Sequence, residues 1–250
     1  MSMFQEERPD AKKIATDRPK KLGPVRAWSY STLKKFETCP YQIYIEKVKK
    51  IPQDSSPAAD RGSAIHLEAE DYVKGDLGEE VPKNLQKFKA DFEELRSLYE
   101  EGKVELEGEW GFDLDMQPVG WLEDKTWGRI KLDAMVLEDE TSARVIDYKT
   151  GRKDGNEIPH SHQALLYAIG AFYKYPDLQY AQTELWYLDK GETMIKNYTR
   201  NDAMVFAPGY YKRAIRMTTA TEFDPTPSKQ NCRWCSYRKG DEPQCVHGIE

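Results

Sequence analysis

Long apolar runs are absent from the 250-residue sequence. No stretch approaches the roughly 20 apolar residues that a membrane-spanning helix requires. Residues 1–25 contain four lysines but no apolar segment, which argues against a secretory signal and predicts a flexible N-terminal tail. Internal repeats and low-complexity tracts are absent too. The remaining length predicts a single domain over residues 26–250.

The sequence has no excess of basic residues over acidic ones. The 37 Lys and Arg are outnumbered by 43 Asp and Glu, which gives a formal net charge of −6. This balance argues against a protein that coats nucleic acid through bulk attraction. Local basic groups can still contact phosphates, and Arg129 and Lys131 are the candidates for substrate binding. The composition predicts a cytoplasmic protein with no membrane association.

Cysteine is scarce. There are four, and nothing in the sequence indicates an oxidising compartment, so disulfides are the least favoured interpretation. Cys232 and Cys235 form a Cys-x-x-Cys pair, Cys245 follows after nine residues, and Cys39 stands alone near the N-terminus. The spacing over residues 232–245 is typical of a metal knuckle. A tetrahedral zinc site is one structure that four cysteines can build.

What the sequence does contain is a pair of aspartates and a lysine on expected strands. Alternate side chains of a strand point to one face, so Asp147 and Lys149 point together. In the preceding strand Asp133 shares a face with Arg129 and Lys131. The opposite face of that strand is expected to be apolar and comprises Ile130, Leu132, Ala134 and Val136. If the two strands are neighbours, both aspartates converge.

Carboxylate oxygens of this kind suit Mg²⁺ or Mn²⁺, which also bind water and substrate phosphate oxygens. A lysine beside them can position a water molecule and offset charge on a phosphorus centre. Taken alone, an Asp-x-Lys pattern is more often explained by a solvated strand face. The surrounding sequence favours the metal site.

The segments "GRIKLDAMV" and "VIDYKTG" resemble the PD-(D/E)XK nuclease superfamily, especially its RecB-like branch. The resemblance implies a restriction-endonuclease-like α/β core with a mixed central sheet flanked by helices. It implies catalytic roles for Asp133, Asp147 and Lys149. The two aspartates and the main-chain carbonyl of Tyr148 would hold one or two Mg²⁺ or Mn²⁺ ions.

Three other segments are similar to the same branch. In "RGSAIHLEAE", His66 corresponds to a histidine that joins the metal site, and a packed or solvated histidine is the alternative. In "HQALLYA", Gln163 and Tyr167 match a Q-x-x-x-Y pattern on the substrate side, although any amphipathic helix would also pair them. Glu109 in "GEWGFDLD" corresponds to an acidic residue before the first core strand. Its close competitors are Glu105 and Glu107.

The cysteines are similar to those of AddB-type nuclease domains, in which one Cys before the core and three near the C-terminus hold a [4Fe-4S] cluster. The resemblance implies that Cys39, Cys232, Cys235 and Cys245 bind such a cluster through their thiolates. The cluster would join the N- and C-terminal segments. Zinc remains the alternative cofactor.

Hydrophobic spacing and capping residues predict the order of the elements. Helices are expected from Ser29 or Ser31 to about Lys50, over 62–74, from Lys83 to Glu101, over 160–175, and from Asn201 to about 217. Strands are expected near 105–115, 127–138, 143–149, 180–189 and 192–199, with a hairpin at Gly191.

The sequence therefore predicts a divalent-metal-dependent deoxyribonuclease. By analogy with the RecB-like relatives it is expected to be an exonuclease on single-stranded DNA ends in recombination, repair or replication, with a helicase or recombination partner. The expected location is the cytoplasm of a bacterial or phage-infected cell. Two alternatives are a non-catalytic DNA-binding or assembly subunit on the same scaffold, and an RNA-directed nuclease.

Overall fold

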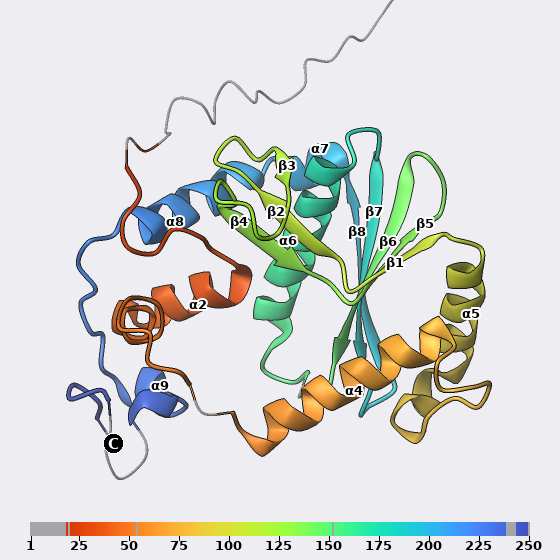
Figure 1. Ribbon diagram of the computed structural model, residues 1–250, viewed down its shortest axis with the longest axis horizontal. Helices are drawn as coiled ribbons and strands as arrows, with labels where there is room; N and C mark the ends of the chain where they lie inside the picture. The colour runs from red at the N-terminus through yellow and green to blue at the C-terminus, as the bar shows by residue number, and fades with distance from the viewer. Residues whose placement is uncertain (1–18, 20, 54, 152, 239–243, 250) are drawn as a thin grey trace, which may run out of the picture.

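The computed structural model describes residue 19 and residues 21–53, 55–151, 153–238 and 244–249 (Figure 1). Helices cover both faces of a central five-stranded sheet, which confirms the expected mixed sheet flanked by helices. Within these ranges no helix has the length and apolar character needed to cross a bilayer.

The expected tail, residues 1–25, lies mostly outside the described residues. Its last part packs against the domain: Gly23 N donates a hydrogen bond to Thr218 O at 2.7 Å, and Val25 is buried in the core. The packed part of the chain therefore begins before residue 26.

The central sheet is mixed. Its strands, in spatial order, are β1 (Val104–Leu106), β5 (Ala134–Leu137), β6 (Ser142–Lys149), β7 (Tyr180–Tyr187) and β8 (Glu192–Thr199). Neighbours are antiparallel except β6 and β7, whose parallel pairing requires a crossover. Helix α6 (Glu157–Lys174) supplies it. β7 and β8 form the expected hairpin, in which Gly191 has a φ of +72° that favours glycine.

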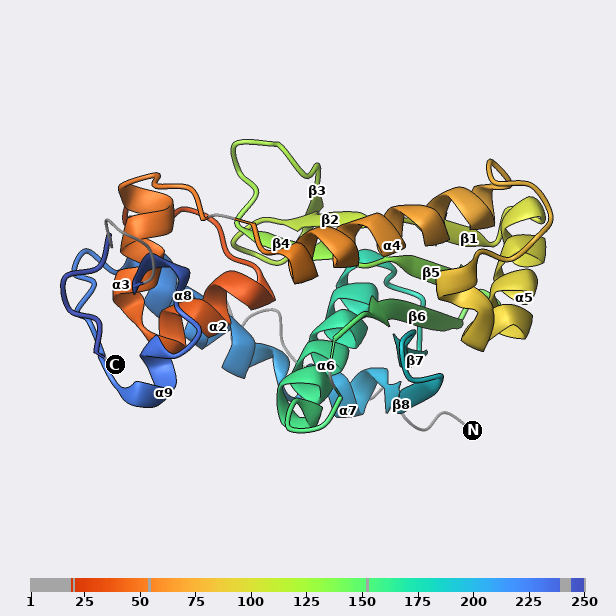
Figure 2. The same ribbon diagram turned by 90° about the horizontal axis from the view of Figure 1, so that it is seen from below.

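Alternation along β6 separates two apolar clusters. Ile146 and Tyr148 pack with helices α4 (Pro57–Lys74) and α5 (Lys89–Glu100), which η2 (Lys83–Phe88) precedes. Val145 packs on the other face, with α6 and α8 (Ala207–Thr219). Figure 2 shows α4 and α6 on opposite sides of the sheet. Asp147 and Lys149 consequently lie on the α6 side.

A second sheet divides the strand expected over residues 127–138. It comprises β3 (Pro118–Val119), β2 (Glu109–Phe112) and β4 (Gly128–Lys131). The chain leaves this sheet after β4 and enters the central sheet at β5, with Leu132 and Asp133 between them.

The alternation of buried side chains shifts at this crossing. Ile130 and Leu132 belong to the cluster on the α6 side, whereas Ala134 and Val136 belong to the cluster on the α4 side. The expectation of one apolar face from Ile130 to Val136 is therefore wrong. Its physical cause is that the two halves pair in different sheets, and the shift leaves Asp133 at the junction.

The helix expected to run to Lys50 is interrupted at Cys39. Ser29 caps α2 (Tyr30–Thr38), and Pro40 begins the short α3 (Pro40–Ile43), which a π-helical turn, η1 (Tyr44–Val48), follows. Cys39 has an extended conformation, with φ −158° and ψ 106°, because a residue before proline disfavours the helical region.

The C-terminal segment returns to this interruption. After α7 (Arg200–Met204) and α8, the chain forms α9 (Lys229–Cys232) and η3 (Ser236–Arg238). The side chains of Thr226 and Asn231 both donate to Thr38 O, at 2.7 and 3.0 Å. The two ends of the domain are thus held together beside Cys39.

Candidate active site

Asp133 and Asp147 come from neighbouring strands and are nearly buried, at 8% and 6% exposure. Asp133 directly precedes β5, and Asp147 lies near the end of β6. Asp133 Oδ2 accepts a hydrogen bond from the main-chain N of Tyr148 at 2.5 Å, which joins the strands beside the two carboxylates. Buried carboxylates need partners, so the neighbouring groups decide what this pair can do.

His66 is a direct partner of Asp133. It lies on α4, and its Nδ1 is 2.7 Å from Asp133 Oδ1. Burial opposes the imidazolium form, but the hydrogen bond and charge of Asp133 outweigh burial and raise the pKa of His66 above its usual value. Burial also raises the pKa of Asp133, against the opposing hydrogen bond from His66. His66 thus lies in the acidic site, where the resemblance placed it.

Glu107 is the third carboxylate at this position. Glu107, Asp133 and His66 each offer one ligand atom, and these atoms lie within 4.8 Å of one another. Glu107 has a φ of 48°, which is uncommon for a non-glycine residue, and its N donates to Asp133 O at 2.8 Å. Glu109 lies instead at the exposed start of β2, and Glu105 accepts hydrogen bonds from aromatic side chains. Of the three glutamates, Glu107 is therefore the one that lies with Asp133 and His66.

Polar contacts connect Asp147 to Lys149 through α6. Lys149 Nζ lies 2.5 Å from Asp147 Oδ2 and donates to Gln163 Oε1 at 3.0 Å. Gln163 Nε2 contacts Tyr167 OH at 2.7 Å, and that hydroxyl donates to Asp147 Oδ1. Burial and the charge of Asp147 raise the pKa of Tyr167 well above its usual value, so the hydroxyl keeps its proton. Gln163 and Tyr167 hold Asp147 and Lys149 in position.

Except for Lys149, these groups line an open cavity of about 530 Å³ between α4 and α6, which we call the acidic cavity. Gly62 forms part of the wall. A Cβ at Gly62 would lie 3.0 Å from Thr150 Oγ1, so glycine lets α4 approach the end of β6. The lining residues include His66, Glu107, Asp133, Asp147, Gln163 and Tyr167.

Most of the chain matches a known family. Residues 27–125 and 127–239 match the model of the PD-(D/E)XK nuclease superfamily. The chain belongs to this superfamily. Membership indicates a nuclease that hydrolyses phosphodiester bonds. It confirms the superfamily that was predicted from the segments "GRIKLDAMV" and "VIDYKTG".

Fourteen chains of solved structures also resemble this PD-(D/E)XK protein. One of them, described as "Crystal structure of SSO0001", is 19% identical in sequence, with a TM-score of 0.50, and the similarity covers 91% of each chain. At this identity the likeness concerns the fold. No curated protein matched the chain.

PD-(D/E)XK nucleases use divalent metal ions, and the donors of the acidic cavity fit one. Carboxylate oxygens suit Mg²⁺ and Mn²⁺, and His66 adds an imidazole nitrogen. Asp147 Oδ2 is buried and forms an ion pair with the ammonium of Lys149 at 2.5 Å. Two buried carboxylates side by side need positive charge, and a divalent ion would add to the charge that Lys149 supplies.

The two basic residues expected to bind substrate lie in different surroundings. Lys131 lines the acidic cavity and forms an ion pair with Glu107 at 2.8 Å. Arg129 lies two positions earlier on β4, and its guanidinium stacks on Trp121, 5.3 Å from the ring centroid. Arg129 does not line the acidic cavity.

The four cysteines gather far from this site. All are free thiols, and all line one small cavity between α3 and the C-terminal segment. Cys39 Sγ accepts a hydrogen bond from Thr226 N at 3.4 Å. No three of the four sulfurs, all of which are described, lie mutually within 4.8 Å. Cys39 thus meets the C-terminal knuckle, although it is separated from Cys232 by 193 positions.

Proposed function

We propose that this protein is a divalent-metal-dependent deoxyribonuclease of the RecB-like branch. The observation that carries the proposal is the convergence of Asp133, Asp147, His66 and Glu107 on one open cavity, with the ammonium of Lys149 paired to Asp147. A non-catalytic DNA-binding subunit on this scaffold would have no need for a buried carboxylate pair beside a lysine. Buried charges of this kind are costly to keep, and they are a common feature of catalytic sites.

The residues brought together at this site have distinct roles in the proposed reaction. His66, Asp133, Asp147 and the main-chain carbonyl of Tyr148 would hold one or two Mg²⁺ or Mn²⁺ ions, and Glu107 would be a further ligand. A bound divalent ion lowers the pKa of water and neutralises charge on the phosphate.

Lys149 orients the attacking water and offsets charge at the phosphorus centre. Its ammonium is held between Asp147 and Gln163, so its position is defined before substrate binds. Tyr167 keeps Asp147 oriented through Oδ1, while Oδ2 faces the ammonium of Lys149.

We further propose that the substrate is single-stranded DNA attacked from an end during recombination, repair or replication. A helicase or recombination protein would then supply the unpaired strand. The support for this is the sequence resemblance to RecB-like nucleases, which act in this way. The corresponding location is the cytoplasm of a bacterial or phage-infected cell.

The cysteine site is proposed to hold a [4Fe-4S] cluster. The four thiols line one cavity, so all four can bind one metal centre. The sequence resemblance to AddB-type nuclease domains supports the cluster, in which each thiolate bonds one iron. A tetrahedral zinc ion is the alternative.

The test is cleavage of a single-stranded deoxyoligonucleotide by the full-length protein with Mg²⁺ or Mn²⁺, compared with the same reaction in EDTA. Separate 5′ and 3′ labels distinguish stepwise removal of terminal nucleotides from internal cuts. An RNA of the same sequence provides the comparison for the alternative substrate. Metal-dependent loss of the DNA supports the proposal. Tight DNA binding without cleavage under every metal condition would instead assign the non-catalytic role.

A further inference from the structure

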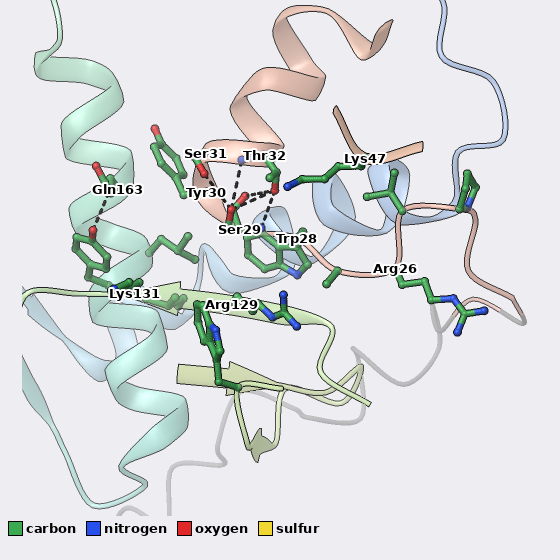
Figure 3. Close-up of a pocket in the computed structure, with 17 residues that line it drawn as sticks. Arg26, Trp28, Ser29, Tyr30, Ser31, Thr32, Lys47, Arg129, Lys131 and Gln163 are labelled. Carbon is green, nitrogen blue, oxygen red and sulfur yellow. Dashed lines mark hydrogen bonds between the residues drawn. The ribbon is translucent and has the colours of Figure 1, made fainter. Parts of the chain in front are cut away.

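A second cavity adjoins the acidic cavity on the side of β4. Its volume is about 500 Å³, within the range of small-ligand sites. Figure 3 shows Arg129 and Lys131 on β4 facing Ser29–Thr32, at the start of α2, across this space. Lys131, Gln163 and Tyr167 line both cavities, so the two spaces adjoin at these side chains. We call the second one the basic cavity.

The charge of the basic cavity is the opposite of that of its neighbour. Its lining includes Arg26, Lys47, Arg129 and Lys131 and contains no Asp or Glu. Lys47 and Lys131 have acidic partners outside the lining. Among the described residues, no ion pair neutralises Arg26 or Arg129. In a chain with a net charge of −6, this concentration of cations predicts an anionic ligand.

Two buried donors in the basic cavity lack acceptors. Trp28 is 3% exposed, and its indole Nε1 has no hydrogen-bond partner among the described residues. Arg129 Nε is buried and unpartnered in the same way. The two residues are adjacent, because Arg129 N donates to Trp28 O at 2.9 Å. Buried N–H groups are nearly always paired in native proteins, so these two point to an oxygen supplied by a ligand.

An aromatic surface accompanies the donors. Trp121 is partly exposed on the loop between β3 and β4, and the guanidinium of Arg129 stacks against its ring. Leu122, the next residue, is 83% exposed. Aromatic rings with adjacent cations are the usual binding surfaces for unpaired nucleobases and their phosphates. A paired base within a duplex cannot present its face in this way.

We propose that the basic cavity binds a nucleotide next to the scissile phosphate of an unpaired strand. Its phosphate accepts hydrogen bonds from Trp28 Nε1 and the Arg129 guanidinium, and its base stacks on Trp121. The N-terminus of α2, which begins at the cavity, adds a favourable dipole for the phosphate. The proposal rests on the proposed nuclease function, since it assigns the substrate strand of that same site.

The experiment measures binding of a short fluorescent deoxyoligonucleotide to the full-length protein by anisotropy in EDTA, where cleavage cannot occur. Trp121→Ala should raise the Kd for the single strand by about 10-fold, the loss expected for one stacked base, and should leave duplex binding unchanged. Trp121→Phe, which keeps an aromatic ring, should bind nearly as well as the wild type. Arg129→Gln should reduce the slope of log K against log salt by about 0.7, as expected for one lost phosphate contact on a single strand.

Arg233 and Trp234 provide the matched control. They form a second exposed arginine–tryptophan stack, with the guanidinium 5.1 Å from the ring centroid, outside both cavities. Trp234→Ala should leave single-strand binding unchanged.

Wild-type affinity in Trp121→Ala and an unchanged salt slope in Arg129→Gln would overturn the proposal. Equal losses for single strand and duplex in Trp121→Ala, or an equal loss in Trp121→Phe, would overturn the assignment of a stacked base. The proposed nuclease function fails separately, if the wild type binds the strand in EDTA but does not cut it with Mg²⁺ or Mn²⁺.

Discussion

A substitution at Tyr167 tests how the site holds Asp147 in position. Its hydroxyl contacts Asp147 and Gln163, while its ring is buried in the core. Tyr167→Phe removes only the hydroxyl, so the melting temperature should change little. The turnover number should fall about 10- to 100-fold, the usual effect of losing a group that orients a metal ligand.

The measurement is kcat and KM for a single-stranded oligonucleotide, with Tyr180→Phe as the control, because Tyr180 is exposed at the far end of β7. A Tyr167→Phe enzyme with unchanged kcat would show that Asp147 is oriented without the hydroxyl.

Protonation of His66 is expected to make both the stability of the fold and the affinity for metal depend on pH. Its raised pKa means that, without metal, the protonated imidazole stabilises the fold fully below the unfolded value of about 6.5. That contribution is lost as the pH rises through the folded value. A divalent ion needs the neutral imidazole, so metal affinity should rise over the same interval.

Thermal unfolding in EDTA and calorimetric Mn²⁺ binding, each followed from below pH 6.5 upwards, test this prediction in the wild type and in His66→Gln. The variant should lose the His66 contribution to both pH dependences. If Mn²⁺ binds both proteins with the same pH dependence, His66 does not bind the metal.

At the residue scale, alternation on a strand was sufficient to predict that Asp147 and Lys149 share a face. The choice of Glu107 over Glu105 and Glu109 was not accessible in this way. It depends on a left-handed backbone conformation at Glu107, and no residue type in the segment specifies that conformation. Sequence spacing therefore identified the strand residues but not the residue at the turn between β1 and β2.

At the scale of elements, α6 links the two sheets through its packing. A Cβ added at Gly170 would lie 2.5 Å from Ile130 Cδ1 on β4. Gly170→Ala should therefore destabilise the protein. Overpacking lowers the free energy of unfolding by about 1–3 kcal/mol, and the better helix propensity of alanine restores up to ~1 kcal/mol of it. Gly209 in α8 is the matched control, since nothing lies within 4 Å of its added Cβ.

Gly209→Ala should stabilise the protein by up to ~1 kcal/mol. Urea unfolding of the two variants and the wild type gives both values. A stabilised Gly170→Ala would show that α6 and β4 are not in close contact.

The main elements could be predicted from the sequence, but their division between sheets could not. The apolar runs of β6, β7 and α6 are long enough to identify each element. The strand expected over residues 127–138 also exists, but the shift of alternation at Leu132 and Asp133 arises from pairing with two different partners. Such pairing is set by tertiary contacts between distant segments, so it cannot be predicted from the local periodicity of the sequence.

At the scale of the whole molecule, the proposed cluster would connect the two ends of the domain through the four cysteines. Cys39→Ala should destabilise the protein as much as Cys232→Ala, because a four-thiolate site that lacks one ligand loses its cofactor. By the loop-closure model, joining positions 193 residues apart contributes on the order of 5 kcal/mol.

Iron, sulfide and zinc contents, measured beside thermal unfolding for both variants and the wild type, test this connection. Full occupancy and normal stability in Cys39→Ala would show that the knuckle is local. In that case His247, which lines the same cavity, is the expected fourth ligand.

The overall charge was a poor guide to the surface. A net charge of −6 conceals an acidic cavity beside a basic one, and the basic cavity forms only where residues 24–32, Trp121 and β4 meet. These segments are far apart in the sequence, and the second sheet brings them together. Arg129 was identified as a candidate from its charge, whereas Trp28 could not be separated from the core aromatic residues.

The most direct test of the account compares wild type and Lys149→Ala in single-turnover cleavage of a labelled single-stranded oligonucleotide with Mg²⁺, with Mn²⁺ affinity and melting temperature measured for both proteins. The lysine is assigned to the attacking water and not to metal binding. The variant should therefore fold normally, bind Mn²⁺ with similar affinity and lose cleavage. A Lys149→Ala protein that folds, binds metal and cuts at the wild-type rate would contradict the assignment of this cavity as the nuclease active site.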